Sequence, residues 1–172
     1  DDPVEYDFKG PVWVYVGRVA VEKNIEEFLD LNLPGAKVVI GDGPDRERLA
    51  KAYPDCHFLG YKFGRELARH IAGADVFVFP SKTDTFGIVM LEAMACGVPV
   101  AAFPVTGPID VVRPGETGCL HSDLMTACSC ALELNRWDCR QYAETRSWGR
   151  STRQFVSHLA PRDLCLADAK VA

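Results

Sequence analysis

Short, almost continuously apolar runs alternate along the chain with segments that have the apolar spacing of helices. The apolar runs cover residues 12–17, 36–41, 56–60, 75–80 and 98–103, and the helical segments cover residues 24–32, 45–53, 64–73 and 86–96. Strands buried on both faces are apolar at nearly every position, and parallel neighbours need a crossover that usually contains a helix. The pattern therefore predicts an α/β fold with a doubly wound parallel sheet and helices on both faces.

The ends of the chain follow a different pattern. Only helical signals occur from residue 122 to residue 160, and we expect these helices to pack against the sheet or to cross to a neighbouring domain. The sequence predicts one folded domain over residues 11–160 and a C-terminal tail over residues 161–172.

At the start of the first helical segment, Asn24 and Glu27 have the spacing of a capping box.

Composition narrows the classes of partner. The 172 residues carry 19 basic and 24 acidic side chains, a formal net charge of -5, which argues against a broad nucleic-acid-binding face. No apolar run approaches the roughly 20 residues of a membrane-spanning helix, and the first ten residues, "DDPVEYDFKG", are acidic rather than signal-like. We expect a soluble, cytoplasmic protein with no nucleic-acid partner.

The seven cysteines are odd in number and irregularly spaced, and none forms a CxxC pair. Neither a disulfide framework nor a zinc site is supported by such spacing. A metal cluster of Cys119, His121, Cys128 and Cys130 is conceivable, but buried reduced thiols explain these residues without a ligand. The sequence predicts no metal site.

Two acids, Asp84 and Glu92, stand on either side of an apolar segment. Asp84 falls in the loop after a predicted strand, and we expect the next helix to begin near Thr85 or Phe86. Glu92 then lies about 12 Å further along the helix axis, two turns on and close to the same face. Both carboxylates are therefore expected to face one groove.

The start of this helix is predicted to bind an anion. The backbone N–H groups of Phe86, Gly87 and Ile88 lack intrahelical partners there, and Gly87 leaves room for a ligand. A ligand with hydroxyls at one end, a phosphate in the middle and a diol at the other end, such as a nucleotide-sugar, fits this layout. On spacing alone, Asp84 as an ordinary loop acid and Glu92 as an exposed helix residue remain an equal alternative.

The first predicted strand ends in "VGRVAVEKN", which places Gly17, Arg18 and Lys23 at the carboxyl edge of the sheet. Ligands of open α/β folds bind at this edge. Arg18 can neutralise a diphosphate as a planar fork and Lys23 as a point charge. The alternative for both residues is a role in surface solubility.

The second predicted strand ends in "GDGPDR", which begins like a dinucleotide fingerprint. Arg46 occupies the position of the third glycine, so NAD binding is poorly supported. A tight turn explains the segment without a ligand, although the absent side chains of Gly41 and Gly43 also leave room for one.

Four segments in this order resemble one known family: "VGRVAVEKN", "VVIGDGP", "FLGYKFGRELARHIAGADVFVFPS" and "DTFGIVMLEAMACGVPVAA". The family is that of the retaining glycosyltransferases of family 4, also called group 1, and the resemblance covers residues 12–155. It implies a Rossmann-like domain that binds the nucleotide-sugar and forms the C-terminal half of a GT-B architecture. Residues 1–10 look like the linker that follows the N-terminal acceptor domain, which we expect to be supplied in cis or in trans.

The resemblance also implies roles for individual side chains. Arg18 and Lys23 would hold the donor diphosphate, and Asp84, which joins them as a candidate catalytic residue, would contact the transferred sugar. Glu92 would bind the ribose and Tyr61 the base, although Tyr61 is equally well explained as an aromatic residue at a strand end. The family has Glu where this chain has Asp84, one methylene shorter, which leaves the sugar open.

Backbone groups complete the donor site that the resemblance implies. They come from Gly17, Gly41 and Gly43, from the loop and helix start, and from Gly107 with its neighbour Asp110 in the loop after the fifth strand. The loop and helix-start residues are Thr85, Phe86, Gly87 and Ile88.

The implied reaction transfers a hexose from a nucleoside-diphosphate sugar to an acceptor hydroxyl, with retained configuration and with neither a metal nor a cofactor beyond the donor. A non-catalytic nucleotide-sugar-binding module is the alternative, and another Rossmann-like nucleotide-binding protein ranks after it. Arginines 136, 140, 146, 150 and 153 could contact an anionic acceptor, a membrane surface or the N-terminal domain, but with Asp138 and Glu144 among them an ordinary solvated helical face is favoured.

Overall fold

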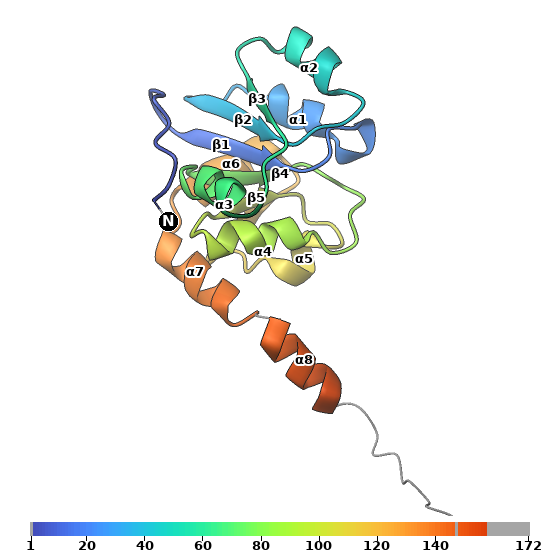
Figure 1. Ribbon diagram of the computed structural model, residues 1–172, viewed down its shortest axis with the longest axis vertical. Helices are drawn as coiled ribbons and strands as arrows, with labels where there is room; N and C mark the ends of the chain where they lie inside the picture. Colours follow the sequence, from blue (N-terminus) through green and yellow to red (C-terminus); the bar gives the residue numbers. More distant parts are fainter. Residues whose placement is uncertain (1, 147, 158–172) are drawn as a thin grey trace, which may run out of the picture.

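A six-stranded, wholly parallel sheet forms the centre of the molecule in a computed structural model that describes residues 2–146 and 148–157 (Figure 1). The strand order is β3-β2-β1-β4-β5-β6. The strands are β1 (Val12–Val16), β2 (Ala36–Ile40), β3 (His57–Gly60), β4 (Val76–Phe79), β5 (Val100–Ala102) and β6 (Gly118–Leu120). The order reverses between β1 and β4, where a crevice opens at the carboxyl ends of the strands.

Helices cover both faces of this sheet (Figure 1). Buried side chains of α3 (Gly64–Ala72), α4 (Ile88–Ala95), α5 (Pro108–Val111) and α7 (Arg136–Glu144) form a core on one face. Those of α1 (Ile25–Leu29), α2 (Arg46–Ala52) and α6 (Leu124–Leu132) form a core on the other. The helix α8 (Trp148–Ser157) and the short 3-10 helix η1 (Val21–Lys23) complete the elements.

Alternate residues of each strand enter opposite cores, which is why the strands are apolar throughout. Val14 and Phe77 pack with α3 and α4, whereas Trp13 and Val76 pack with α1 and α6. The predicted doubly wound α/β fold and its first five strands are confirmed. The sixth strand was not predicted, because β6 has only three residues and pairs with β5 alone at the edge of the sheet.

The helix predicted for residues 86–96 begins later than expected. Its N-cap is Gly87, with φ 71°, so the first helical residue is Ile88. At the other end the helix stops as predicted, because Gly97 takes the left-handed conformation, φ 74°, that commonly follows a helix. The one-turn helix α5, which follows Gly107 with Pro108 at its first position, was not predicted.

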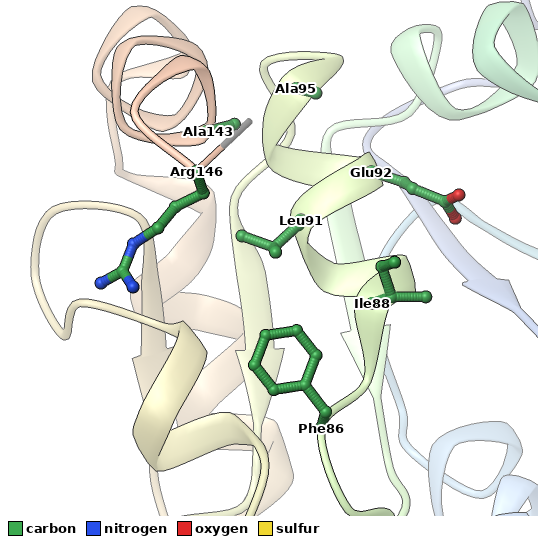
Figure 2. Close-up of a pocket in the computed structure, with 7 residues that line it drawn as sticks. All are labelled: Phe86, Ile88, Leu91, Glu92, Ala95, Ala143 and Arg146. Atoms are coloured by element: carbon green, nitrogen blue, oxygen red, sulfur yellow. The ribbon is translucent and has the colours of Figure 1, made fainter. Parts of the chain in front are cut away.

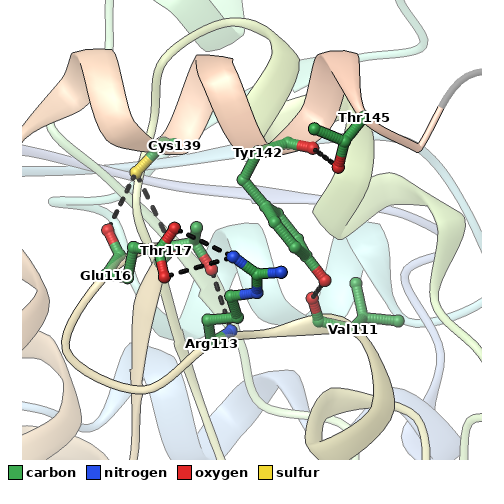
Figure 3. A network of polar contacts seen from close by, with 7 residues as sticks. All are labelled: Val111, Arg113, Glu116, Thr117, Cys139, Tyr142 and Thr145. Carbon is green, nitrogen blue, oxygen red and sulfur yellow. Dashed lines mark hydrogen bonds and ion pairs between the residues drawn. The ribbon is translucent and has the colours of Figure 1, made fainter.

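The helix α7 is fixed to the sheet by a small polar network (Figure 3). The Tyr142 hydroxyl donates to Val111 O at 3.0 Å, and the Cys139 thiol lies 3.8 Å from Thr117 O. The Arg113 guanidinium lies 4.5 Å from the centre of the Tyr142 ring, and Arg113 N donates to the buried Thr117 hydroxyl at 2.9 Å. These contacts hold α7 against α5 and against the segment that leads into β6.

The expectation that the cysteines are reduced is wrong for one pair. Cys119 on β6 and Cys130 on α6 form a disulfide with 6.0 Å between their Cα atoms. Their spacing does not predict this bond, because the two residues meet only when α6 packs back on the sheet edge. Burial raises the pKa of the free thiols of Cys128 and Cys139, to about 12 and about 11. In the described part of the chain no group of His, Cys, Asp or Glu is arranged to hold a metal ion.

The predicted linker packs against the domain over part of its length. Val4 N donates to Arg69 O at 2.9 Å, the Tyr6 hydroxyl lies 3.0 Å from His70 Nδ1, and the Phe8 ring stacks on His57. Residues 161–172, the predicted tail, lie outside the described residues. Among residues 2–146 and 148–157 no helix is long and apolar enough to span a membrane.

We expect Gly41→Ala to destabilise the fold by about 3 kcal/mol or more, since the new methyl group would lie 1.9 Å from Gly17 O at φ 137°. Gly115→Ala is the control, because Gly115 has φ 79° and no neighbour within 4 Å, which leaves a strain cost of about 1 kcal/mol. Urea unfolding at 25 °C measures both. Equal losses would contradict the close packing assigned to Gly41.

Candidate functional site

A cleft of about 390 Å³ lies at the carboxyl ends of β1 and β4, where the strand order reverses. Its walls come from the end of β1 and the following loop, the end of β4 and the first turn of α4. The lining residues are Tyr15, Val16, Gly17, Arg18, Lys23, Phe79, Ser81, Asp84, Gly87, Ile88 and Val89. The cleft therefore occupies the place where ligands bind in open α/β sheets.

The loop after β1 presents a cation to the cleft. The Tyr15 hydroxyl donates to Arg18 O at 2.8 Å, which fixes the backbone just after Gly17. The Arg18 side chain is 63% exposed and lies 3.3 Å from the Glu22 carboxylate. Exposed ion pairs of this kind contribute little to stability, so Arg18 can turn to an anionic ligand at low cost.

Lys23 and Asp84, which the sequence assigned to the diphosphate and to the sugar of a ligand, form an ion pair. Lys23 Nζ lies 2.6 Å from Asp84 Oδ1, and the two side chains are 25% and 22% exposed. Burial acts to raise the pKa of Asp84, but hydrogen bonding and charge from Lys23, helped by Ser81, lower it below its ordinary value. Asp84 is therefore a carboxylate at neutral pH.

Two buried polar atoms beside this ion pair lack a hydrogen bond of good geometry within the described chain. They are Asp84 Oδ2 and the Ser81 hydroxyl, and Ser81 is only 1% exposed. Buried polar groups are usually paired, and an unpaired one inside a cleft indicates a place for a ligand or a water molecule. The sequence reasoning missed Ser81, although it directly follows the strand residues that were singled out.

The N–H groups left free at the start of α4 are not the ones that the sequence predicted. Because the helix begins at Ile88, the N–H groups of Ile88 and Val89 lie in its first turn and have no acceptor within the helix, whereas Met90 N donates to Gly87 O at 2.9 Å. Thr85 and Phe86 lie in the loop and are exposed. Of the three N–H groups predicted to bind an anion, that of Ile88 belongs to the helix start and those of Phe86 and Gly87 precede the helix, whereas Val89 was not predicted.

Gly107 lets two loops around the cleft approach each other, and Gly87 packs against side chains of α4 and β4. A side chain on Gly87 would lie 2.6 Å from Met90 Cε, and one on Gly107 would lie 3.1 Å from Asp84 O. Gly107, with φ 96°, thus packs the loop after β5 against the loop that carries Asp84. Asp110 is exposed on α5.

Glu92 does not share the cleft with Asp84, contrary to the expectation of a common groove. It lines a second pocket of about 370 Å³ (Figure 2), whose other residues are Phe86, Ile88, Leu91, Ala95, Ala143 and Arg146. Figure 2 shows Ile88 and Glu92 on one side of α4, and Ile88 lines both pockets. The Glu92 carboxylate is exposed and forms no hydrogen bond or ion pair with another described residue.

Three further candidates lie outside the cleft. Tyr61 is 59% exposed after β3 and stacks on Phe63, with 5.7 Å between ring centres. A side chain on Gly41 would lie 1.9 Å from Gly17 O, and one on Gly43 would lie 2.2 Å from Val19 O. The structure therefore gives Gly41 and Gly43 a packing reason, since they let the loops after β1 and β2 touch.

Comparison with known proteins agrees with this arrangement. A sequence profile of the family described as "Glycosyl transferases group 1" matches residues 10–133. A relative named GDP-mannose-dependent alpha-mannosyltransferase, from Mycobacterium tuberculosis, is 43% identical over 112 residues. That match covers 64% of this chain and 30% of the relative, so the chain spans about a third of that protein's length.

Solved structures show the same fold at low sequence identity. The apo form of the lipopolysaccharide outer core galactosyltransferase WaaB superposes with a TM-score of 0.74 at 22% identity, over 91% of this chain and 50% of that one. HepE of Anabaena, solved in complex with UDP, superposes with a TM-score of 0.65 at 17% identity, over 86% of this chain and 49% of that one.

Lys23→Met should lower the free energy of unfolding at neutral pH but not at acidic pH, compared with the wild type. In the wild type the lowered pKa of Asp84 adds stability above the ordinary value of 3.8, and this stability is lost as pH falls through the folded-state pKa. Without Lys23, burial raises that pKa, so at pH 7 the variant should be less stable by about 1–2 kcal/mol.

The difference between the two proteins should shrink as pH falls through the raised pKa of Asp84 in the variant, and it should vanish only below the lowered pKa of Asp84 in the wild type, where the carboxyl is protonated in both. Arg140→Met, which breaks the exposed pair with Glu144, is the matched control and should show no such pH dependence. Urea unfolding from pH 3 to pH 8 measures the effect. A loss that is the same at every pH would contradict the ion pair.

Proposed function

The chain belongs to the group 1 glycosyltransferases, and we propose that it is the donor-binding part of a retaining enzyme of that family. In this proposal the cleft binds a nucleoside-diphosphate sugar, whose hexose passes to an acceptor hydroxyl. The observation that carries the proposal is the meeting of Arg18, Lys23, Asp84 and the start of α4 in one cleft at the switch point of the sheet.

The diphosphate is proposed to bind where positive charge gathers. Arg18 is exposed at the rim, and the N–H groups of Ile88 and Val89 lie in the first turn of α4. A helix start and a guanidinium both favour an anion, and each gains strength as negative charge grows on the leaving diphosphate. The chemistry assigned to this chain is therefore electrostatic stabilisation of the leaving group.

Asp84 is proposed to hold the transferred sugar. Its Oδ1 accepts from Lys23, whereas its Oδ2, beside the Ser81 hydroxyl, has no hydrogen bond of good geometry and keeps the capacity to accept one from a sugar hydroxyl. The charge of Lys23 keeps the carboxylate ionised and ready to accept. Lys23 is thus proposed to have two roles, since it keeps Asp84 ionised and also attracts the phosphates.

The other end of the donor is assigned to Glu92 and Tyr61. Glu92 is one helical turn beyond Ile88 and its carboxylate is free, so it can accept hydrogen bonds from both ribose hydroxyls. Tyr61, stacked on Phe63, offers an exposed aromatic face to a base. Gly107 shapes the loop that borders the sugar.

The names of the similar proteins suggest which nucleotide base and which sugar to test first. The name of the Mycobacterium tuberculosis relative mentions GDP-mannose, and HepE was solved with UDP. We propose GDP-mannose as the first donor to test and UDP-sugars as the second. We further propose that binding needs neither a metal nor a cofactor.

A second candidate function is nucleotide-sugar binding without transfer. The chain spans 30% of the relative with the mannosyltransferase name, and in our proposal the acceptor site belongs to a further domain. Transfer by this chain on its own would show that no such domain is needed, whereas binding without transfer fits both a donor half and a binding module.

We expect GDP or UDP at about 100 times its dissociation constant to raise the unfolding temperature by about 5 °C, since a ligand of the native state stabilises it by mass action. The shift should persist in EDTA. NAD is the comparison ligand. A shift with NAD and none with either nucleotide at millimolar concentration would overturn the proposal.

Glu92→Ala should weaken nucleoside-diphosphate binding about tenfold, the loss expected for hydrogen bonds to a charged acceptor. Asp84→Ala should chiefly remove the additional affinity of the nucleotide-sugar over the nucleotide. Glu144→Ala, on α7, is the control. Calorimetric titration with GDP, UDP and GDP-mannose measures the affinity of each variant. Equal, negligible effects of Asp84→Ala and Glu92→Ala would show that neither acid binds the donor.

A further inference from the structure

Asn24 has an unusual backbone conformation next to the cleft. Its φ of 55° is the only positive value at a non-glycine residue among the described residues. Asn accepts this conformation better than most residues do, but a departure of this kind at a site suggests a role for the side chain. The residue directly follows Lys23, whose ammonium group reaches Asp84.

The side chain of Asn24 does not cap the helix, contrary to the expectation of a capping box. Its amide instead donates to Glu27 Oε2 at 2.5 Å and to Pro80 O at 3.0 Å. Pro80 directly follows β4, so one amide group joins the loop after β1 to the loop after β4. This bridge runs beside the Lys23–Asp84 ion pair, which joins the same two loops.

Glu27 is the acidic centre of the bridge. Lys82, from the loop after β4, lies 2.8 Å from the same oxygen, Glu27 Oε2, that accepts from Asn24. Burial acts to raise the pKa of Glu27, but hydrogen bonds from Lys82 and Asn24 lower it. Glu27 therefore stays ionised and holds one group from each loop.

The same network reaches the third loop around the cleft. Lys82 Nζ lies 4.3 Å from the centre of the Phe103 ring, and Phe103 directly follows β5. This is the loop that packs Gly107 against Asp84 O. The loops after β1, β4 and β5 are thus joined through Glu27 and Lys82.

We propose that Asn24 and Glu27 are positioning residues of the donor site, which hold Lys23 against Asp84 by tying together the loops after β1, β4 and β5. Neither residue lines the cleft, so both act through others. This inference rests on the proposed donor site for its functional consequence, but the positioning of Lys23 can be measured without a ligand.

Two variants of Asn24 separate this role from a purely conformational one. Asn24→Gly keeps the left-handed backbone at no steric cost but removes the amide. Asn24→Asp keeps a residue that tolerates this backbone, yet it cannot donate to Pro80 O and it places a second carboxylate beside Glu27. If Asn24 serves only its backbone conformation, both variants should behave as the wild type.

In the positioning role the variants form an ordered series. Glu27→Gln should have a small effect, because Gln still accepts from Asn24 but loses its charge attraction to Lys82. Asn24→Gly should weaken binding of GDP or UDP about tenfold, the loss typical of hydrogen bonds to a charged group, and Asn24→Asp should weaken it further. Glu116→Gln, which breaks the exposed pair with Arg113, is the matched control.

The pKa of Asp84, followed by carboxyl NMR on the whole chain, is the second measurement. It should rise in Asn24→Gly and in Asn24→Asp, since burial raises it once Lys23 is no longer held close. It should not move in Glu116→Gln. Circular dichroism and the unfolding temperature check that the variants are folded.

The two measurements distinguish the two proposals. If the wild type binds neither GDP nor UDP, the proposed function fails, and the Asp84 pKa alone decides the positioning role. If the wild type binds a nucleotide and both Asn24 variants keep its affinity and the pKa of Asp84, the positioning role is overturned while the donor site stands.

Discussion

The ion pair between Lys23 and Asp84 is the interaction on which the rest of the site depends. It joins the loop after β1 to the loop after β4, the two strands between which the order of the sheet reverses. Each charge is largely withdrawn from water, so each needs the other. The pair therefore fixes two separate loops at one distance, and the cleft lies between them.

Close backbone packing makes this arrangement rigid. Gly41 and Gly43 let the carbonyl oxygens of Gly17 and Val19 lie where side chains would otherwise be, and Gly107 does the same for the loop that carries Asp84. The charged groups consequently stand on loops that pack closely against one another. A donor would meet a site that is already assembled, with Arg18 as its most exposed cation. Preformed electrostatics of this kind favours stabilisation of a leaving group.

The sequence predicted the sheet well because strands buried on both faces have a simple apolar pattern. It also placed Arg18, Lys23 and Asp84 near one another, since residues after parallel strands meet at the carboxyl edge. It did not predict that Lys23 and Asp84 pair, that Asp84 and Glu92 line different pockets, or that Asn24 bridges two loops. Those features depend on side-chain directions and on contacts between segments more than fifty residues apart, which local spacing does not encode. The Cys119–Cys130 disulfide escaped prediction because these two residues, 11 apart in the sequence, meet only through the packing of α6 on the sheet edge.

The most direct test of the central claim is a titration of the isotopically labelled chain with GDP and with UDP, followed by backbone amide NMR. The account predicts the largest shifts at Gly17, Arg18, Ile88 and Val89, around the Lys23–Asp84 pair, with Cys130 and Trp137 unaffected. Saturable shifts confined to another surface, or no shifts with either nucleotide at millimolar concentration, would contradict it.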